Sequence, residues 1–348
     1  MKETALTERS QGYGRAIELL ETADRLVLTT HVQPDGDGIG SEVALALHLR
    51  SLGKTATILN PHPTPRRFAF LEPDPSIVPY DQTAADRHLE AADLLVVLDI
   101  SVPDRLGRLV EHVRRISPPT LIIDHHTGPA TIRGFDLRDT DAAATGVLIY
   151  ELLGRWGAEL TPDIATALYA AIAYDTGGFR FSNTRERAHR IAAELIGRGA
   201  RALEVNHHLF ESVSLPRMRL LARVLDRFRL SPNGRVASVV LPVSEMERAE
   251  ATAEDVEGIV ETLRAIEGVE VAILVKEVGR EATKVSFRSS GPYDVAGFAS
   301  RYGGGGHRNA AGAFIASPIA DVAERLIPQA HAAFDDGPIA GIRDRERG

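Results

Sequence analysis

The amino-acid sequence predicts an α/β fold: a doubly wound, mainly parallel sheet domain followed by a smaller α/β domain, with an active-site cleft between them. Short segments rich in β-branched residues are almost continuously apolar, as expected for strands that are covered on both faces of a sheet. These segments alternate with longer amphipathic stretches of helical spacing, such as residues 38–52. Strand–helix–strand alternation of this kind is typical of parallel sheets.

The first half of the chain contains four strand candidates and three helix candidates. The strands are expected at residues 25–30, 55–60, 93–98 and 120–123. The helices are expected at residues 38–52, 141–156 and 163–174. Thr161 and Pro162 mark the start of the last helix, because threonine caps a helix and proline fits its first turn.

The second half of the chain begins where this pattern breaks, near residues 204–216. A connecting helix is expected at 215–230, strands at 236–240, 271–275 and 283–287, and helices at 253–266 and 294–302. We therefore predict a catalytic domain at residues 1–205, a linker and connecting helix at 206–230, a second domain at 231–331 and a frayed tail at 332–348.

The composition is that of an ordinary globular protein. Of the 348 residues, 44% are hydrophobic and 25% are charged, which argues against disorder. The absence of cysteine excludes disulfides, thiolate metal sites and cysteine nucleophiles. A net charge of −8 is unusual for a protein that grips long nucleic acid, because each phosphate contact requires Lys or Arg. No signal peptide or membrane span is recognisable, so we expect a cytoplasmic protein without membrane contact.

Side chains of the types that bind metal ions follow three predicted strands and one predicted helix. They are His31, Asp35 and Asp37 after the first strand, Asp99 after the third, Asp124, His125 and His126 after the fourth, and Asp175 after the helix. Because the carboxyl ends of parallel strands form the binding crevice of an open sheet, these segments should converge. Converging carboxylates would repel one another unless cations neutralised them.

Each of these pieces has an ordinary structural explanation when taken alone. An aspartate after a strand is commonly a helix cap or a turn residue, and residues 35–38 fit a turn followed by an N-cap. The joint occurrence instead favours two divalent cations. Oxygen and imidazole ligands without sulfur suit Mn²⁺ best, with Mg²⁺ or Co²⁺ as alternatives and Zn²⁺ as a substitute.

The four motifs resemble those of the DHH phosphoesterase family. The pattern His31-x3-Asp35-x-Asp37, Asp99, Asp124-His125-His126 and Asp175 follows the family's order, and residues 301–312 (RYGGGGHRNAAG) resemble the signature of the DHH-associated domain. The resemblance covers about residues 15–330. Within the family, a short chain of two domains is similar to the nano-RNase/pAp-phosphatase branch, which also includes hydrolases of linear and cyclic dinucleotides.

The resemblance implies a role for each of these residues. His31 and Asp35 would hold the first metal ion, Asp37, His125 and Asp175 would hold the second, and Asp99 would bridge the two. Asp124 would orient a histidine rather than bind metal. His126 and Asp99 would be the catalytic residues, with His126 beside the scissile phosphate, where its protonated form would stabilise charge on the phosphoryl oxygens. The two metal ions would hold the hydroxide that attacks phosphorus.

Substrate-binding residues are expected in the second domain. Successive glycines at 303–306 fit a hinge or a tight turn, but their backbone N–H groups can also surround an anion. Arg288 ends a predicted strand, and its planar guanidinium suits a phosphate. With the resemblance, we expect a nucleotide-phosphate site made by Arg288, Gly304, Gly305, Gly306, His307 and Asn309.

The predicted function is the metal-dependent hydrolysis of RNA of about two to five nucleotides to 5′-mononucleotides, and of pAp to AMP. A phosphodiesterase for pApA or cyclic di-AMP is a close alternative. A single-strand exonuclease of the RecJ type, an inorganic pyrophosphatase and a non-catalytic nucleotide sensor are less favoured. The expected partners are therefore short RNA, pAp and linear or cyclic dinucleotides, not long duplexes, and the sequence leaves a homodimer open.

Overall fold

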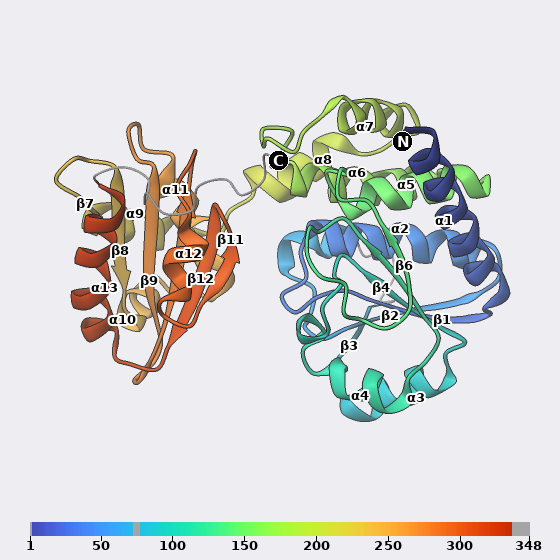
Figure 1. Cartoon of the computed structure of the whole chain (residues 1–348), viewed down its shortest axis with the longest axis horizontal. Coiled ribbons are helices and arrows are strands. Elements are labelled where there is room, and N and C mark those ends of the chain that lie inside the picture. The colour runs from blue at the N-terminus through green and yellow to red at the C-terminus, as the bar shows by residue number, and fades with distance from the viewer. Residues whose placement is uncertain (1, 72–76, 336–348) are drawn as a thin grey trace. The chain divides into compact units, whose positions relative to one another are not determined.

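The computed structural model describes residues 2–71 and 77–335 of the chain, apart from the side chains of residues 2–10, Pro79 and His307 (Figure 1). The chain divides into two compact units, Met1–Ser212 (unit 1) and Val213–Gly348 (unit 2). The division falls inside the predicted linker at residues 206–230. Within the described residues, no helix combines the length and the apolar character that crossing a membrane requires.

Unit 1 is built on a six-stranded parallel sheet with the order β3-β2-β1-β4-β5-β6. The strands are β1 (Arg25–Thr29), β2 (Thr55–Asn60), β3 (Ile77–Pro79), β4 (Leu94–Leu98), β5 (Thr120–Asp124) and β6 (Phe135–Arg138). The chain moves outward in one direction from β1 and in the other from β4, so the order reverses between these two central strands. Ligands of open α/β sheets bind at such a reversal, outside the carboxyl ends of the strands.

Helices cover both faces of this sheet (Figure 1). One face carries α1 (Lys2–Thr22), α2 (Gly36–Ser51), α5 (Thr145–Trp156) and α6 (Pro162–Asp175), and the other carries α3 (Gln82–Ala91) and α4 (Leu109–Ile116). Helices α7 (Glu186–Gly197) and α8 (Ala202–Asn206) pack on α6. Short turns of helix complete the unit: η1 (Arg66–Leu71), η2 (Pro103–Leu106) and the π-helical η3 (His207–Glu211).

Two glycines allow α2 and α5 to pack so closely against α6 that no side chain fits between the helices at these positions. A Cβ atom on Gly40 of α2 would lie 2.4 Å from the carbonyl oxygen of Ala167, and one on Gly146 of α5 would lie 2.6 Å from the Cβ of Ala171. Real Cβ atoms do not tolerate such contacts, because they lie inside van der Waals distance. The N-terminal parts of α2 and α5 are therefore held close to α6.

Unit 2 contains a second six-stranded sheet, with the order β11-β12-β10-β9-β8-β7. Its strands are β7 (Arg229–Leu230), β8 (Val236–Leu241), β9 (Val271–Gly279), β10 (Ala282–Ser289), β11 (Gly305–His307) and β12 (Ala310–Ile315). Only β8 and β9 pair in parallel. The helices are α9 (Leu215–Arg227), α10 (Val243–Arg248), η4 (Glu254–Val256), α11 (Ile259–Arg264), α12 (Val295–Ser300) and α13 (Ile319–Phe334).

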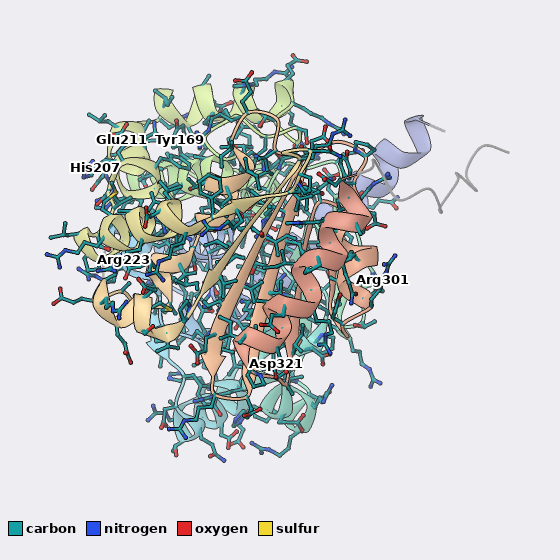
Figure 2. The ribbon with its side chains drawn as sticks, turned by 90° about the vertical axis from the view of Figure 1, so that its left-hand side faces the viewer. Tyr169, His207, Glu211, Arg223, Arg301 and Asp321 are labelled. Carbon is teal, nitrogen blue, oxygen red and sulfur yellow. The ribbon has the colours of Figure 1, made fainter. Side chains whose placement is uncertain are left out.

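A buried acid joins two of the helices of unit 2. The carboxylate of Glu245 in α10 is 3.0 Å from Arg223 of α9, which is labelled in Figure 2, and 3.1 Å from Arg227. Arg248 approaches the same carboxylate at 2.7 Å. Because three guanidinium groups surround it, the buried Glu245 side chain is paired, as burial of a charge requires.

The predicted fold class is confirmed, but three elements differ from the sequence-based expectations. The helix expected at 253–266 is divided into η4 and α11, because Gly258 between them adopts a left-handed φ of +75°. The connecting helix ends at Arg227, and the chain continues into strand β7. Helix α13 reaches the fully buried Phe334, so the frayed tail does not begin at residue 332. Residues 336–348 of that tail lie outside the described residues.

Candidate metal centre

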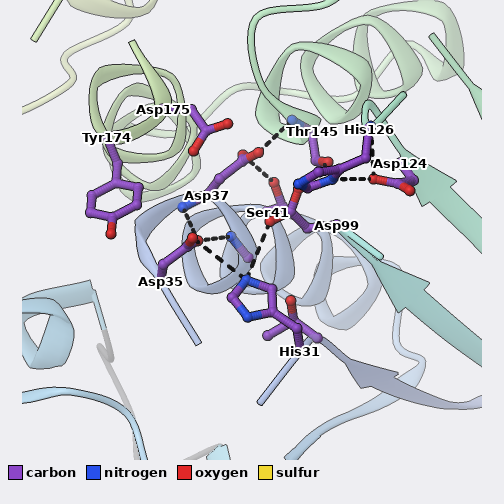
Figure 3. A network of polar contacts seen from close by, with 12 residues as sticks. His31, Asp35, Asp37, Ser41, Asp99, Asp124, His126, Thr145, Tyr174 and Asp175 are labelled. Atoms are coloured by element: carbon purple, nitrogen blue, oxygen red, sulfur yellow. Dashed lines mark hydrogen bonds and ion pairs between the residues drawn. The ribbon is translucent and has the colours of Figure 1, made fainter. Parts of the chain in front are cut away.

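Seven acidic and imidazole side chains converge at the carboxyl ends of β1, β4 and β5 (Figure 3). Their potential ligand atoms form three overlapping groups, in each of which these atoms lie within 4.8 Å of one another. The groups are His31, Asp35 and Asp99; Asp37, His125 and Asp175; and Asp99, His125 and His126.

The first group surrounds His31, which follows β1. Its Nε2 lies 3.5 Å from Asp35 Oδ2 and 3.5 Å from Asp99 Oδ2. The other ring nitrogen, Nδ1, is 2.9 Å from the carbonyl oxygen of Val32, which fixes the orientation of the ring. Asp35 is the N-cap of α2, and its Oδ1 accepts hydrogen bonds from the N–H groups of Asp37 and Gly38. Capping therefore leaves Oδ2 of Asp35 directed towards His31.

The second group surrounds His125, which follows β5. Its Nε2 lies 3.1 Å from Asp175 Oδ2, at the end of α6, and 3.7 Å from Asp37 Oδ2, in the first turn of α2. Asp37 is fully buried and accepts hydrogen bonds from the N–H groups of Thr145 (2.6 Å) and Gly146 (2.8 Å). These N–H groups belong to the first turn of α5. The first N–H groups of a helix have no acceptor within the helix itself, so Asp37 supplies one.

Asp99 lies between the two groups. Its Oδ2 faces His31, whereas its Oδ1 is 3.4 Å from Nε2 of His125 and accepts a hydrogen bond of 2.8 Å from the hydroxyl of Thr145. Asp99 adopts a left-handed φ of +65° directly after β4, a conformation that aspartate tolerates better than most residues. The position and backbone of Asp99 thus direct one carboxylate oxygen to each group.

Asp124 contacts the third histidine. Its Oδ1 is 2.8 Å from Nδ1 of His126, and its Oδ2 accepts a hydrogen bond from the hydroxyl of Ser101. Asp124 is buried, whereas about a third of the His126 side chain is exposed. Asp124 therefore fixes the His126 ring through Nδ1, and part of the ring stays accessible beside the carboxylates.

The pKa values show how the site balances its charge. Burial by itself lowers the pKa of His125, but hydrogen bonds to Asp175 and Asp99 raise it to about 12. His31 follows the same pattern, with Asp35 and Asp99 raising its pKa to about 10. Burial raises the pKa of Asp175 to about 6, and also raises that of Asp37. Protons on the imidazoles thus supply the positive charge that the carboxylates need.

The donor set fits divalent cations. Carboxylate oxygens and imidazole nitrogens suit Mn²⁺, Mg²⁺ and related ions, and the groups around His31 and His125 each offer three such donors. Cations would replace the protons of the two imidazoles as the source of positive charge, because an imidazole must be neutral to ligate.

Three hydroxyl groups that the sequence analysis did not identify hold the carboxylates. Thr145 donates to Asp99, Ser101 to Asp124 and Ser41 to Asp37, the last at 3.3 Å. Serine and threonine are common at such positions in any α/β protein, so the sequence contains no signal that distinguishes these three. Their importance becomes visible only when the strands and helices are placed in space.

The residues expected to bind substrate lie in unit 2. Arg288 of β10 forms an ion pair of 2.7 Å with Glu261 of α11. The amide nitrogen of Asn309 donates to Ser289 and to the carbonyl oxygens of Gly291 and Tyr293, so it holds the turn after β10.

The predicted glycine-rich loop leads into β11. A Cβ on Gly304 would lie 2.2 Å from the carbonyl oxygen of Gly312, and Gly306 has a φ of +142°. Gly305 pairs with Gly312 of β12. The side chain of His307 lies outside the described residues.

A buried acid is connected through hydrogen bonds to the residue that precedes His31. Glu42 of α2 is inaccessible to solvent, and its Oε2 accepts a hydrogen bond of 2.8 Å from the amide of Asn60. Asn60, at the end of β2, accepts in turn from the N–H of Thr30, next to His31. The Oε1 atom of Glu42 has no hydrogen-bond partner among the described residues. Burial raises the pKa of Glu42 to about 8, against the lowering effect of the Asn60 hydrogen bond.

The substitution Glu42→Gln should therefore change how stability depends on pH. Because the folded-state pKa is raised from 4.5, the folded chain binds this proton more tightly, and its contribution to stability is lost as pH rises from 4.5 to about 8. The glutamine side chain does not titrate, so the variant should gain stability over wild type through this range, on the order of a few kcal/mol at one pKa unit per ~1.4 kcal/mol. Denaturant unfolding of both proteins at pH 5, 6.5 and 8 measures this, and a pH-independent difference would contradict it.

Comparisons with known proteins identify the family of the chain. The DHH family N-terminal domain matches residues 25–172, and the DHHA1 domain matches residues 233–336. The bifunctional oligoribonuclease and PAP phosphatase NrnA of Thermus thermophilus is 34% identical over 293 residues, 83% of each chain. The protein of the same name from Bacillus subtilis is 31% identical over 316 residues, 89% of this chain and 95% of that protein.

A solved structure resembles the whole fold. The crystal structure of an exopolyphosphatase-related protein from Bacteroides fragilis is 26% identical, with a TM-score of 0.88, and the match covers 94% of this chain and 97% of that chain. Both domain matches occur in the order that the motifs predicted. The chain therefore belongs to the DHH family and carries the DHHA1 domain that follows it.

Proposed function

We propose that this protein is a metal-dependent phosphoesterase that hydrolyses short oligoribonucleotides to 5′-mononucleotides and pAp to AMP. The observation that carries the proposal is the arrangement of Asp99 between two groups of donors, one with each carboxylate oxygen. Two cations that share a carboxylate are typical of enzymes that displace a group at phosphorus. The relatives named bifunctional oligoribonuclease and PAP phosphatase support the substrate class.

Each residue of the centre has a proposed role. His31 and Asp35 would hold one cation, Asp37, His125 and Asp175 the other, and Asp99 would contact both. We propose Mn²⁺ as the native ion, because the donors are mixed oxygen and nitrogen and include no sulfur. When bound, the two cations would activate water and neutralise part of the phosphate charge.

The remaining groups would orient the substrate and the ligands. His126 would donate a hydrogen bond to a phosphoryl oxygen, because Asp124 holds the ring through Nδ1 and part of the ring is accessible. Thr145 would keep the carboxylates of Asp37 and Asp99 in place through its N–H and its hydroxyl. Arg288 and the glycine-rich loop of unit 2 would bind the nucleotide.

The substrate panel that tests this function varies length and chemistry. The purified protein is incubated with Mn²⁺ and with pAp, pApA, cyclic di-AMP, RNA of five and of about 24 nucleotides, single-stranded DNA or pyrophosphate, and initial rates are compared. Because the net charge is −8, a long RNA gains no general electrostatic attraction to the chain, so we expect the rate per RNA end to fall steeply with length. Equal rates on the two RNAs would favour an exonuclease, and a preference for cyclic di-AMP would favour the dinucleotide phosphodiesterase.

A further inference from the structure

Arg67 is an arginine that the site described above does not use. It lies in η1, which begins six residues after β2, on the side of the sheet where the strands end. Its Nη2 donates to the hydroxyl of Tyr174 at 3.2 Å, and its guanidinium carbon lies 4.7 Å from the centre of the Phe68 ring and 5.3 Å from that of Tyr174. Aromatic rings attract a guanidinium at these distances, so the two rings and the hydroxyl hold the cation in position.

Tyr174 connects this arginine with the metal centre. It directly precedes Asp175 in α6, and a Cβ on Gly36 would lie 2.6 Å from its Cβ, so the tyrosine packs on the turn between Asp35 and Asp37. Figure 3 shows its ring beside Asp35, with the hydroxyl pointing away from Asp175. The buried Phe68 supports the ring edge-on, at 5.5 Å and 84°. Packing therefore holds Arg67 against Tyr174, the residue that directly precedes Asp175 of the site.

We propose that Arg67 binds a phosphate next to the scissile one, which makes unit 1 selective for nucleotides that carry more than one phosphate. This inference rests on the proposed function. A group of carboxylates repels an anionic substrate until cations are bound, and a cation at its rim offsets that repulsion. A guanidinium presents paired N–H donors that match phosphate oxygens, and a ring-supported guanidinium loses little freedom when it binds.

A purely electrostatic role for Arg67 makes different predictions. If the arginine only offset the charge of Asp35, Asp37 and Asp175, its removal would strengthen Mn²⁺ binding and would affect all substrates alike. If it binds a neighbouring phosphate, its removal should affect substrates according to the phosphates they carry. The two roles are therefore separated by a pair of substrates with the same scissile bond.

The experiment compares ApA, whose only phosphate is the scissile one, with pApAp, which has a phosphate on either side. Arg67→Ala should lower kcat/KM for cleavage of the internal bond of pApAp by about 10- to 100-fold more than for ApA, mainly through KM. Arg67→Lys should lose less than Arg67→Ala, because lysine keeps the positive charge but lacks the paired N–H donors of the guanidinium. The matched control is Arg66→Ala, which removes the exposed neighbouring arginine and should leave the ratio of the two substrates as in wild type.

Calorimetric Mn²⁺ titration of each variant completes the test. An equal loss on ApA and pApAp, or no loss on either, overturns the inference, as does a loss matched by Arg66→Ala. Tyr174→Phe keeps the ring and removes only the hydroxyl. It should therefore change the ratio of kcat/KM on pApAp to that on ApA in the same direction by a smaller factor. This variant replaces Arg67→Ala in the test if Arg67→Ala folds poorly. If wild type cleaves neither dinucleotide, the proposed function fails instead, whatever the variants do.

Discussion

Asp99→Asn is expected to lower kcat by more than about 1000-fold on every substrate, which corresponds to about 4 kcal/mol of transition-state stabilisation. The carboxylate directs one oxygen to each group of donors, so the change weakens both cation sites at once. Folding should be kept, because asparagine also tolerates the left-handed backbone at this position and the lost charge relieves repulsion with Asp37. Steady-state kinetics with Mn²⁺, calorimetric metal titration and thermal unfolding measure the three effects.

The matched control for this change lies at the other end of the same strand. Asp93, immediately before β4, accepts hydrogen bonds from the N–H groups of Asp24 and Arg25, and the whole length of β4 separates it from Asp99. Asp93→Asn should keep kcat within about twofold of wild type, since surface polar contacts contribute little. If Asp99→Asn retains more than a tenth of wild-type kcat with its metal content intact, Asp99 does not bridge the cations.

Arg288→Ala is expected to reduce kcat/KM on pAp and pApA by roughly 30- to 1000-fold, or about 2–4 kcal/mol, by analogy with truncation of one partner of a charged pair. An arginine that binds a phosphate remote from the reacting phosphorus aligns the substrate, so KM should carry most of the change. A minimal aryl phosphodiester, which has no second phosphate, should suffer a much smaller loss. Metal content should stay at the wild-type value.

The ion pair with Glu261 supplies the control for Arg288. Glu261→Gln removes the negative partner but leaves the guanidinium, and both side chains are partly exposed, so the cost in stability should be small. If Arg288 binds phosphate, only Arg288→Ala should impair pAp hydrolysis. If instead the two variants lose activity equally, the ion pair serves the fold of unit 2, and the assignment of a phosphate site to this arginine is wrong.

The sequence predicted those parts of the molecule that depend on strong local signals. Long apolar segments marked the four central strands, and the acidic and imidazole residues at their ends marked the centre, because both patterns are rare by chance. The edge strands β3 and β6 were missed, since they are only three and four residues long and carry no clear alternation. The break at Gly258 was missed because the apolar spacing continues on both sides of it.

The contacts that support the site could not be predicted from the sequence, for a different reason. Thr145 starts a helix whose N-cap, Ala144, makes no side-chain hydrogen bond, so nothing local distinguishes this threonine. Its contacts with Asp37 and Asp99 bridge 108 and 46 residues of chain, respectively. Such contacts depend on the packing of α2, α5 and β4 together. Asp35 shows the converse: it is a helix cap, as its local sequence suggested, and it also faces His31.

The close approach of α2 and α5 to α6 limits how this sequence can diverge. A larger side chain at Gly40 would push α2, which carries Asp37, away from α6, which carries Asp175. One at Gly146 would push away from α6 the helix α5, whose first turn donates hydrogen bonds to Asp37. A related chain could keep every acidic and imidazole residue and still fail to assemble the centre if either glycine were replaced. In this chain the two glycines are therefore as necessary to the geometry of the centre as the side chains that form it, although neither contributes a side chain of its own.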